Sequence, residues 1–207
     1  MLVPEDPSYP GVRHNRFARV GEKIEALRVA LVNIAEKQTT WLPIETPPEG
    51  FYPGQLEWAG NSTEVLVETM SRFRDKREFV LATVDGQIKM IYNEKNAAWA
   101  VSAQGKNSGL TWIRNREAFV VVTEKDGWRH AFLYSREGKE LSLLTPGEYD
   151  IIDRAMVDEK GGWYYFYALP DNGTQRYLYR VPLDGSGNLG AHDTAGYSFT
   201  PHRVDLC

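Results

Sequence analysis

The chain has 207 residues, of which 42% are hydrophobic and 25% are charged, a composition that excludes a largely disordered protein. Its 24 basic and 28 acidic side chains give a net charge of −4 and are scattered along the sequence. This balance provides no field that would hold a polyanion, so we expect no nucleic-acid partner. Aromatic residues make up 12% of the chain and favour pleated, half-buried sheets.

Several common sites and signals are absent from the sequence. Its one cysteine, Cys207, excludes an internal disulfide framework, and its four histidines are too far apart in sequence for paired metal ligands, so we expect neither metal nor cofactor. No apolar run approaches the roughly 18 residues that a membrane-spanning helix needs. The first residues lack the basic start and apolar stretch of a secretory signal. Taken literally, this places the chain in the cytosol, although the sequence does not fix the compartment.

Strand-like segments begin after an irregular lead-in segment, residues 1–23. Two strands, Leu27–Ile34 and Thr39–Leu42, are joined by a short polar turn, and a proline-rich linker, Pro43–Pro53, follows. The charged stretch Arg72–Arg77 lies between two later strands, and we interpret it as a solvated hairpin turn. The strands expected between 51 and 105 are Gln55–Trp58, Glu64–Met70, Glu78–Val84 and Ile88–Tyr92, the last two joined by the hairpin signal Asp85-Gly86.

Two further groups of strands follow. Between 106 and 148 the alternation predicts Gly109–Trp112, Phe119–Thr123, Ala131–Tyr134 and Glu140–Leu144. Between 149 and 190 it predicts Ala155–Val157, Trp163–Leu169 and Tyr177–Leu183, with a poorly defined fourth strand. We expect residues 201–207 to form a C-terminal tail.

These groups repeat each other. Residues 117–134 and 162–180 are the same aromatic hairpin 45 positions apart, and Leu110–Trp112 lies 54 residues after Leu56–Trp58. This spacing is typical of the four-stranded blades of a β-propeller. We therefore predict an all-β fold, a partial propeller over 24–200 with about three to four antiparallel blades and a ring that does not close within this chain. The expected blades are 24–50, 51–105, 106–148 and 149–190.

Six strings of the sequence are informative in their order along the chain. They are Leu27–Asn33, Thr39–Leu42, Leu56–Trp58, Glu124–Tyr134, Val157–Phe166 and Leu178–Gly185. Together they resemble the second half of the N-terminal propeller of dipeptidyl peptidase IV-like serine peptidases, which belong to the prolyl oligopeptidase family. The resemblance covers residues 24–187 and implies a scaffold that admits only slender peptides to an active site elsewhere.

The catalytic features of that family are absent from this sequence. None of the nine serines has glycine at both −2 and +2, as the nucleophile elbow Gly-x-Ser-x-Gly requires. The adjacent glutamates that grip a substrate's amino terminus in the family are also missing. We therefore expect no catalytic residue in this chain. We expect the chain to be a non-catalytic propeller fragment that lacks the α/β-hydrolase domain. The family's members are often exported or membrane-anchored.

The expected partners follow from the missing parts. They are the other half of the propeller and the hydrolase domain, or a second copy of this chain, with a peptide substrate only in an intact enzyme. A stand-alone propeller-like module that binds a protein or peptide is the alternative.

Three residues are candidates for lining a substrate passage: Trp99, Arg129 and His130. Trp99 lies in an expected connection between blades, where an aromatic wedge between sheets is the competing interpretation. His130 follows Arg129 in a hairpin, where a hydrogen-bonded structural histidine is the competing interpretation.

Overall fold

In the computed structural model, residues 21–22, 24–45, 47–100, 109–169 and 177–186 are described. These residues contain strands and turns and no helix, and the strands form four antiparallel sheets. The predicted lead-in segment, 1–23, lies outside the described residues except for its end, and the predicted tail, 201–207, lies wholly outside them.

Each sheet is a meander of strands that are consecutive in sequence. The sheet orders are β1-β2, β3-β4-β5-β6, β7-β8-β9-β10 and β11-β12-β13. The strands are β1 (Ala30–Asn33), β2 (Gln38–Trp41), β3 (Phe51–Trp58), β4 (Glu64–Ser71), β5 (Lys76–Thr83), β6 (Ile88–Lys95), β7 (Leu110–Ile113), β8 (Ala118–Thr123), β9 (His130–Ser135), β10 (Glu140–Leu143), β11 (Ile151–Asp158), β12 (Trp163–Ala168) and β13 (Tyr177–Pro182).

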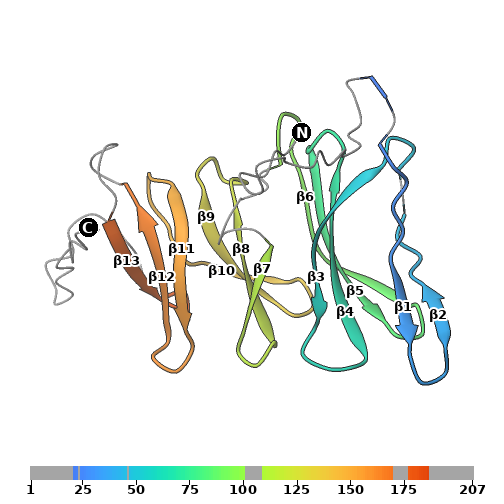
Figure 1. Cartoon of the computed structure of the whole chain (residues 1–207). Helices are drawn as coiled ribbons and strands as arrows, with labels where there is room; N and C mark the ends of the chain where they lie inside the picture. The colour runs from blue at the N-terminus through green and yellow to red at the C-terminus, as the bar shows by residue number, and fades with distance from the viewer. Residues whose placement is uncertain (1–20, 23, 46, 101–108, 170–176, 187–207) are drawn as a thin grey trace, which may run out of the picture.

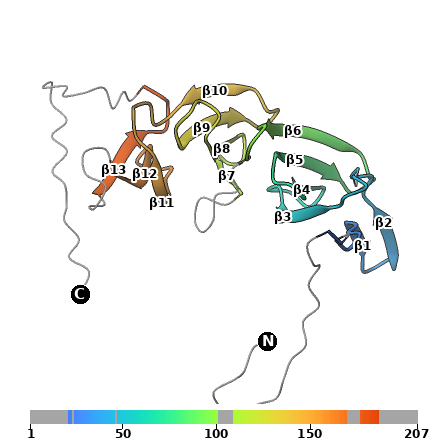
Figure 2. The ribbon, with the colours of Figure 1, turned by 90° about the horizontal axis from the view of Figure 1, so that it is seen from above.

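The four sheets stand side by side (Figure 1). Seen from above, they follow an open arc, with β3, β7 and β11 on its inner side and β6 and β10 on its outer side (Figure 2). This arrangement is the radial packing of a β-propeller, and it confirms the predicted all-β fold with an open ring. Two sheets have four strands, and in the described residues the first has two and the last has three.

The hydrophobic core lies between the sheets, because alternate residues of a strand point to opposite faces. In β4, Val65 and Val67 pack towards the β1-β2 sheet, whereas Leu66 packs towards the β7–β10 sheet. In β8, Phe119 faces back to the β3–β6 sheet and Val120 faces forward to the β11–β13 sheet. Each sheet junction therefore has its own apolar cluster, and the two middle sheets, β3–β6 and β7–β10, are buried on both faces.

Two expectations about the inner strands were wrong in detail. The predicted linker Pro43–Pro53 is wrong at its end, because β3 already begins at Phe51 and includes Pro53 at a register shift against β4. An edge strand tolerates such a proline at a bulge. The expected strand Ala155–Val157 extends over Ile151–Asp158 and also contains register shifts.

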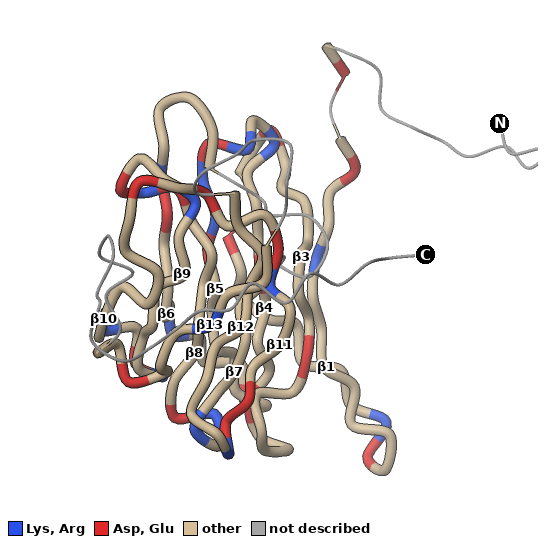
Figure 3. Tube along the Cα trace, turned by 90° about the vertical axis from the view of Figure 1, so that its left-hand side faces the viewer, with Lys and Arg blue, Asp and Glu red and all other residues tan. Residues whose placement is uncertain are grey.

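Charged residues gather at the turns at both ends of the sheets (Figure 3). One end carries the β4-β5 and β8-β9 turns and is named the upper end, after its position in Figure 1. The opposite end, with the β3-β4, β7-β8 and β11-β12 turns, is named the lower end.

Candidate functional site

Arg129 lies in the β8-β9 turn at the upper end, where it connects two sheets. Its Nε and Nη2 donate to Glu124 Oε1 at 3.0 and 2.8 Å. Its backbone N–H donates to Asp150 Oδ1 at 2.7 Å, and its carbonyl accepts from the N–H of Ile151 at 2.8 Å. Arg129 therefore connects the β8-β9 turn to the start of β11, with a guanidinium that is partly exposed.

His130 is buried, with 2% of its surface exposed. Its Nδ1 lies 2.8 Å from Asp126 Oδ2 in the preceding turn, and its ring meets the Tyr149 ring edge-on at a centroid distance of 5.7 Å. Burial raises the pKa of Tyr149, so its phenol stays protonated beside the imidazole. This geometry is that of a hydrogen-bonded structural histidine between sheets, not of a side chain exposed to a ligand.

Trp99 lies in the connection after β6 and is 55% exposed. Asn96 Oδ1 accepts from the N–H groups of Ala98 and Trp99 at 2.9 and 3.3 Å, and Ala100 N–H donates to the Arg74 carbonyl at 2.6 Å. The loop is thus fixed to the β4-β5 turn while the indole remains open to contact. Trp99 is not a buried wedge between the described sheets.

The structure does not bring the three candidates together into one site. Trp99 follows the β3–β6 sheet, whereas Arg129 and His130 belong to the β7–β10 sheet. All three lie at the upper end, but no hydrogen bond, ion pair or ring contact between described residues joins Trp99 to the other two.

A buried charged network joins the β3–β6 and β7–β10 sheets, and the sequence interpretation missed it. Arg77 is fully buried, so the prediction that Arg72–Arg77 is a solvated turn is wrong at its last residue. Arg77 Nε lies 2.7 Å from Glu68 Oε1, and its Nη2 donates to the Gly109 carbonyl at 3.2 Å. Glu68 Oε2 also accepts from the N–H of Gln55 at 2.8 Å. The only sequence signal was a glutamate within the alternating strand β4.

Glu94 extends this network on the neighbouring strand. Its carboxylate accepts from Tyr92 Oη at 2.9 Å and from Thr123 Oγ1, on the next sheet, at 2.7 Å. Burial raises the pKa of Tyr92, which keeps the phenol protonated as a donor. The network is therefore composed of satisfied pairs, which makes it a rigid connection between sheets.

At the lower end, the β7-β8 turn connects three sheets. Arg114, Asn115 and Arg116 all have positive φ, at 51°, 52° and 68°, an uncommon conformation for residues other than glycine. Arg116 Nη1 donates to the Trp58 carbonyl of the preceding sheet. Arg114 Nη2 donates to the Leu183 carbonyl of the following sheet at 3.2 Å. The strained turn thus directs one arginine to each neighbour.

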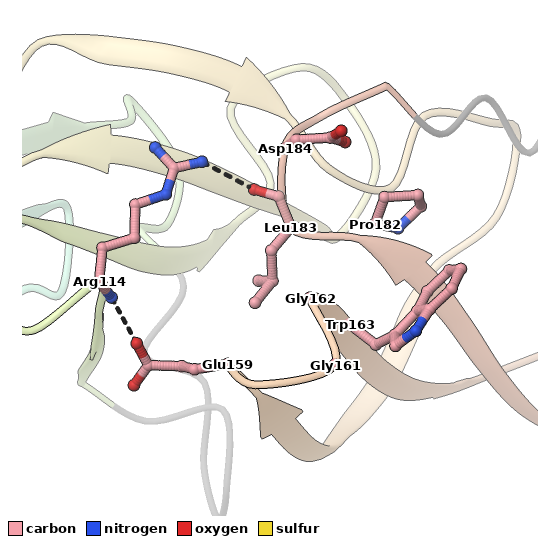
Figure 4. A pocket seen from close by; sticks show the side chains of 8 residues that line it. All are labelled: Arg114, Glu159, Gly161, Gly162, Trp163, Pro182, Leu183 and Asp184. Carbon is pink, nitrogen blue, oxygen red and sulfur yellow. Dashed lines mark hydrogen bonds between the residues drawn. The ribbon is translucent and has the colours of Figure 1, made fainter.

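A cavity of about 430 Å³ lies at the lower end beside this turn (Figure 4). The Arg114 N–H donates to Glu159 Oε2 at 2.6 Å, which fixes the left wall seen in Figure 4. The Glu159 carboxylate and the Arg114 guanidinium, which donates to the Leu183 carbonyl, are therefore both engaged in holding two sheets together. The lining residues are Arg114, Glu159, Gly161, Gly162, Trp163, Pro182, Leu183 and Asp184.

A lysine–tyrosine pair in the β7–β10 meander has the wrong electrostatics for acid–base work. Lys125 Nζ lies 2.7 Å from Tyr134 Oη and also pairs with Glu140. Burial raises the pKa of Tyr134, so the phenol is a poorer acid than usual. We interpret this pair as structural.

Two further features are absent from the described part of the chain. It holds no group of three or more histidine, cysteine, aspartate or glutamate side chains positioned for a metal ion. It also contains no helix with the length and hydropathy that a membrane crossing requires.

Together, the radial meanders, the cores between sheets and the charged connections define the class of protein, an all-β protein built as part of a β-propeller. The sequence matches the family described as "Dipeptidyl peptidase IV (DPP IV) N-terminal region" over residues 1–196. The chain belongs to this family.

Similar proteins agree with the assignment. Dipeptidyl peptidase 4 of Trichophyton rubrum is 26% identical over 182 residues, which are 86% of this chain and 23% of that protein. A probable dipeptidyl peptidase 4 of Emericella nidulans is 22% identical over 184 residues, which are 84% of this chain and 24% of that protein. The chain thus spans about a quarter of the length of the curated relatives it matches.

A solved structure shows the same fold. The crystal structure of Porphyromonas gingivalis dipeptidyl peptidase 4 superposes with a TM-score of 0.73 and 23% sequence identity, covering 88% of this chain and 26% of that chain.

Proposed function

We propose that this chain is a non-catalytic propeller part of a dipeptidyl peptidase IV-like serine peptidase, where it screens the peptides that reach an active site on an α/β-hydrolase part. Its membership of the DPP IV N-terminal region family supports this role. The sequence also offers no serine in the Gly-x-Ser-x-Gly context that such a peptidase uses as its nucleophile.

The observation that carries the proposal is the arc of sheets in Figure 2. The inner strands β3, β7 and β11 follow its inner side, so a ring completed on this arc would enclose a passage. Filled cores at every sheet junction make the wall stiff, because close-packed interiors resist deformation. The width of the passage, not one side chain, would then select slender peptides.

The three candidate residues take different parts in this proposal. Trp99 is exposed on a fixed loop and would contact a passing peptide. Arg129 and His130 would act indirectly, because they fix the β8-β9 turn against the next sheet and so help to shape the passage.

A chimera tests the scaffold role. The segment of Trichophyton rubrum dipeptidyl peptidase 4 that aligns with this chain would be replaced by this chain, and cleavage of an Xaa-Pro chromogenic dipeptide measured. We expect a folded chimera that cleaves the substrate, whereas the isolated chain releases no chromophore. A monodisperse chimera without activity contradicts the proposal, as does hydrolysis by the isolated chain that a fluorophosphonate blocks. Tight peptide binding by the isolated chain would instead support the stand-alone module.

A further inference from the structure

Gln55 lies where the inner strands of two neighbouring sheets meet. The pairing of β3 with β4 has a register shift between Pro53 and Leu56, so Gly54 and Gln55 form a β-bulge opposite Glu68. A bulge leaves backbone groups outside the ladder and redirects a side chain. Here the N–H of Gln55 donates to Glu68 Oε2 at 2.8 Å, and the Gln55 side chain reaches the next sheet.

The Gln55 side chain contacts the beginning of β7. Its Oε1 accepts a hydrogen bond from the N–H of Leu110 at 2.7 Å. Because an N–H can only donate, this bond fixes which end of the carboxamide faces β7. Gly109 lies against the same carboxamide, since a Cβ at this position would overlap Gln55 Oε1. The length of one glutamine side chain therefore sets the separation of the two inner strands at this point.

The buried ion pair holds the same part of β7 from the other side. Glu68, which accepts from the N–H of Gln55, also pairs with Arg77, and Arg77 Nη2 donates to the Gly109 carbonyl at 3.2 Å. The Gly109 carbonyl and the Leu110 N–H belong to one peptide group, and a trans peptide points them in opposite directions. Arg77 and Gln55 thus clamp a single peptide group at the start of β7.

The next sheet junction shows that the fold does not require this clamp. The Leu-x-Trp string of β3 recurs 54 residues later in β7, and both strings pair with the following strand in the same register. The position equivalent to Gln55 is then Gly109, and the position equivalent to Glu68 is Val122. Val122 is buried in the apolar cluster between the β7–β10 and β11–β13 sheets. Sheets of this chain therefore pack without a polar clamp, which indicates a specific role for the one at Gln55.

We infer that Gln55 is a positioning residue, which sets the distance between the inner strands β3 and β7 and thereby the width of the passage. The inference rests on the proposed function, because only a completed ring encloses a passage. Both strands lie on the inner side of the arc (Figure 2). Gln55 acts through the peptide group between Gly109 and Leu110 and needs no contact with substrate. Loss of its acceptor atom should let β7 separate from β3, so that broader substrates pass.

Hydrogen exchange measured by NMR on the full chain tests the contact itself. Gln55→Met preserves the length of the side chain and removes the acceptor. The Leu110 amide should then exchange about fivefold faster, the effect of one net hydrogen bond on a local opening equilibrium. Gln55→Glu retains an acceptor oxygen and should restore the slow exchange. The Arg116 amide, bonded to the Ile113 carbonyl at the other end of β7, should keep its rate in both variants.

Substrate size tests the effect on the passage. In the active chimera, Gln55→Met should raise kcat/KM about fivefold for a folded protein that carries Xaa-Pro at its amino terminus, if passage follows the same opening equilibrium. Its kcat for the Xaa-Pro chromogenic dipeptide should stay unchanged, and Gln55→Glu should show the parental preference for both substrates. Gln87→Met, at an exposed glutamine of the β5-β6 turn, is the matched control and should change neither substrate.

The outcomes separate this inference from the proposed function. A parental exchange rate of the Leu110 amide in Gln55→Met would overturn the inference, as would an active Gln55→Met chimera with the parental preference for the two substrates. An inactive, monodisperse parent chimera would remove the proposed function and the passage together. Circular dichroism must show that Gln55→Met retains its strands; if it does not, Gln55→Asn, whose side chain is one methylene shorter, serves the same comparison.

Discussion

Arg77 and Glu68 form an ion pair inside the molecule, with 2.7 Å between Arg77 Nε and Glu68 Oε1 and both side chains buried. Arg77 also reaches the carbonyls of Gly109 and Val122 in the next sheet. Because these acceptors belong to a different sheet from the arginine, the pair holds two blades in register as well as satisfying two charges.

Removing one partner of this pair should be costly. We expect Arg77→Ala to lower the free energy of unfolding by about 3–5 kcal/mol, because the carboxyl group of Glu68 would stay buried without its ionic partner. Urea unfolding followed by tryptophan fluorescence measures the change. The control is Glu78→Gln, which breaks the partly exposed Lys76–Glu78 pair and should cost no more than about 1 kcal/mol. Equal losses for the two variants would contradict the structural role of the buried pair.

Glu64 should make stability depend on pH. A hydrogen bond from Asn61 and the interaction with Arg136 lower the pKa of the Glu64 carboxyl below its ordinary value of 4.5. Its stabilising contribution is therefore complete above the unfolded-state pKa and is lost as the pH falls through the lower folded-state pKa. We expect the melting temperatures of the parent and Glu64→Gln to differ most near neutral pH and to converge in acid. A melting-temperature difference that grows as the pH falls would contradict the lowered pKa of Glu64.

Two glycines with positive φ provide a matched test of sheet contact. Gly138 in the β9-β10 turn and Gly127 in the β8-β9 turn have φ of 89° and 99°. A Cβ at Gly138 would overlap the backbone carbonyl of Ile91 on the neighbouring sheet, whereas a Cβ at Gly127 meets nothing. Gly127→Ala should therefore cost about 1 kcal/mol for its backbone conformation alone. Gly138→Ala should cost clearly more in the same chemical unfolding assay, and similar losses would contradict the close approach of the sheets.

Trp99 should affect substrate binding and not the free energy of unfolding. Because the indole is largely exposed, Trp99→Ala should change the free energy of unfolding by less than about 0.5 kcal/mol. Phe119→Ala, in the core between sheets, should cost about 3–5 kcal/mol. In the active chimera, Trp99→Ala should raise KM for an Xaa-Pro peptide about three- to tenfold, the effect of losing one aromatic contact. An unchanged KM would remove Trp99 from the passage.

The repeat in the sequence was sufficient to predict the fold, whereas side-chain roles were harder to predict. The hairpins at 117–134 and 162–180 correspond to β8-β9 and β12-β13, since alternation and turn residues are local properties. The strand β3 was predicted only over Gln55–Trp58 and not from Phe51, because Pro53 normally indicates a break and only pairing with β4 allows it there.

The sequence by itself determined the order of the strands, their meander connections and their two-sided apolar pattern, because each depends on neighbouring residues. Only the tertiary structure decided that Arg77 is buried, that His130 faces a sheet junction and that Trp99 is open to solvent. These outcomes depend on which atoms of the next sheet lie opposite a side chain, and those atoms belong to residues some 30 or more positions away in the chain, such as Gly109 for Arg77.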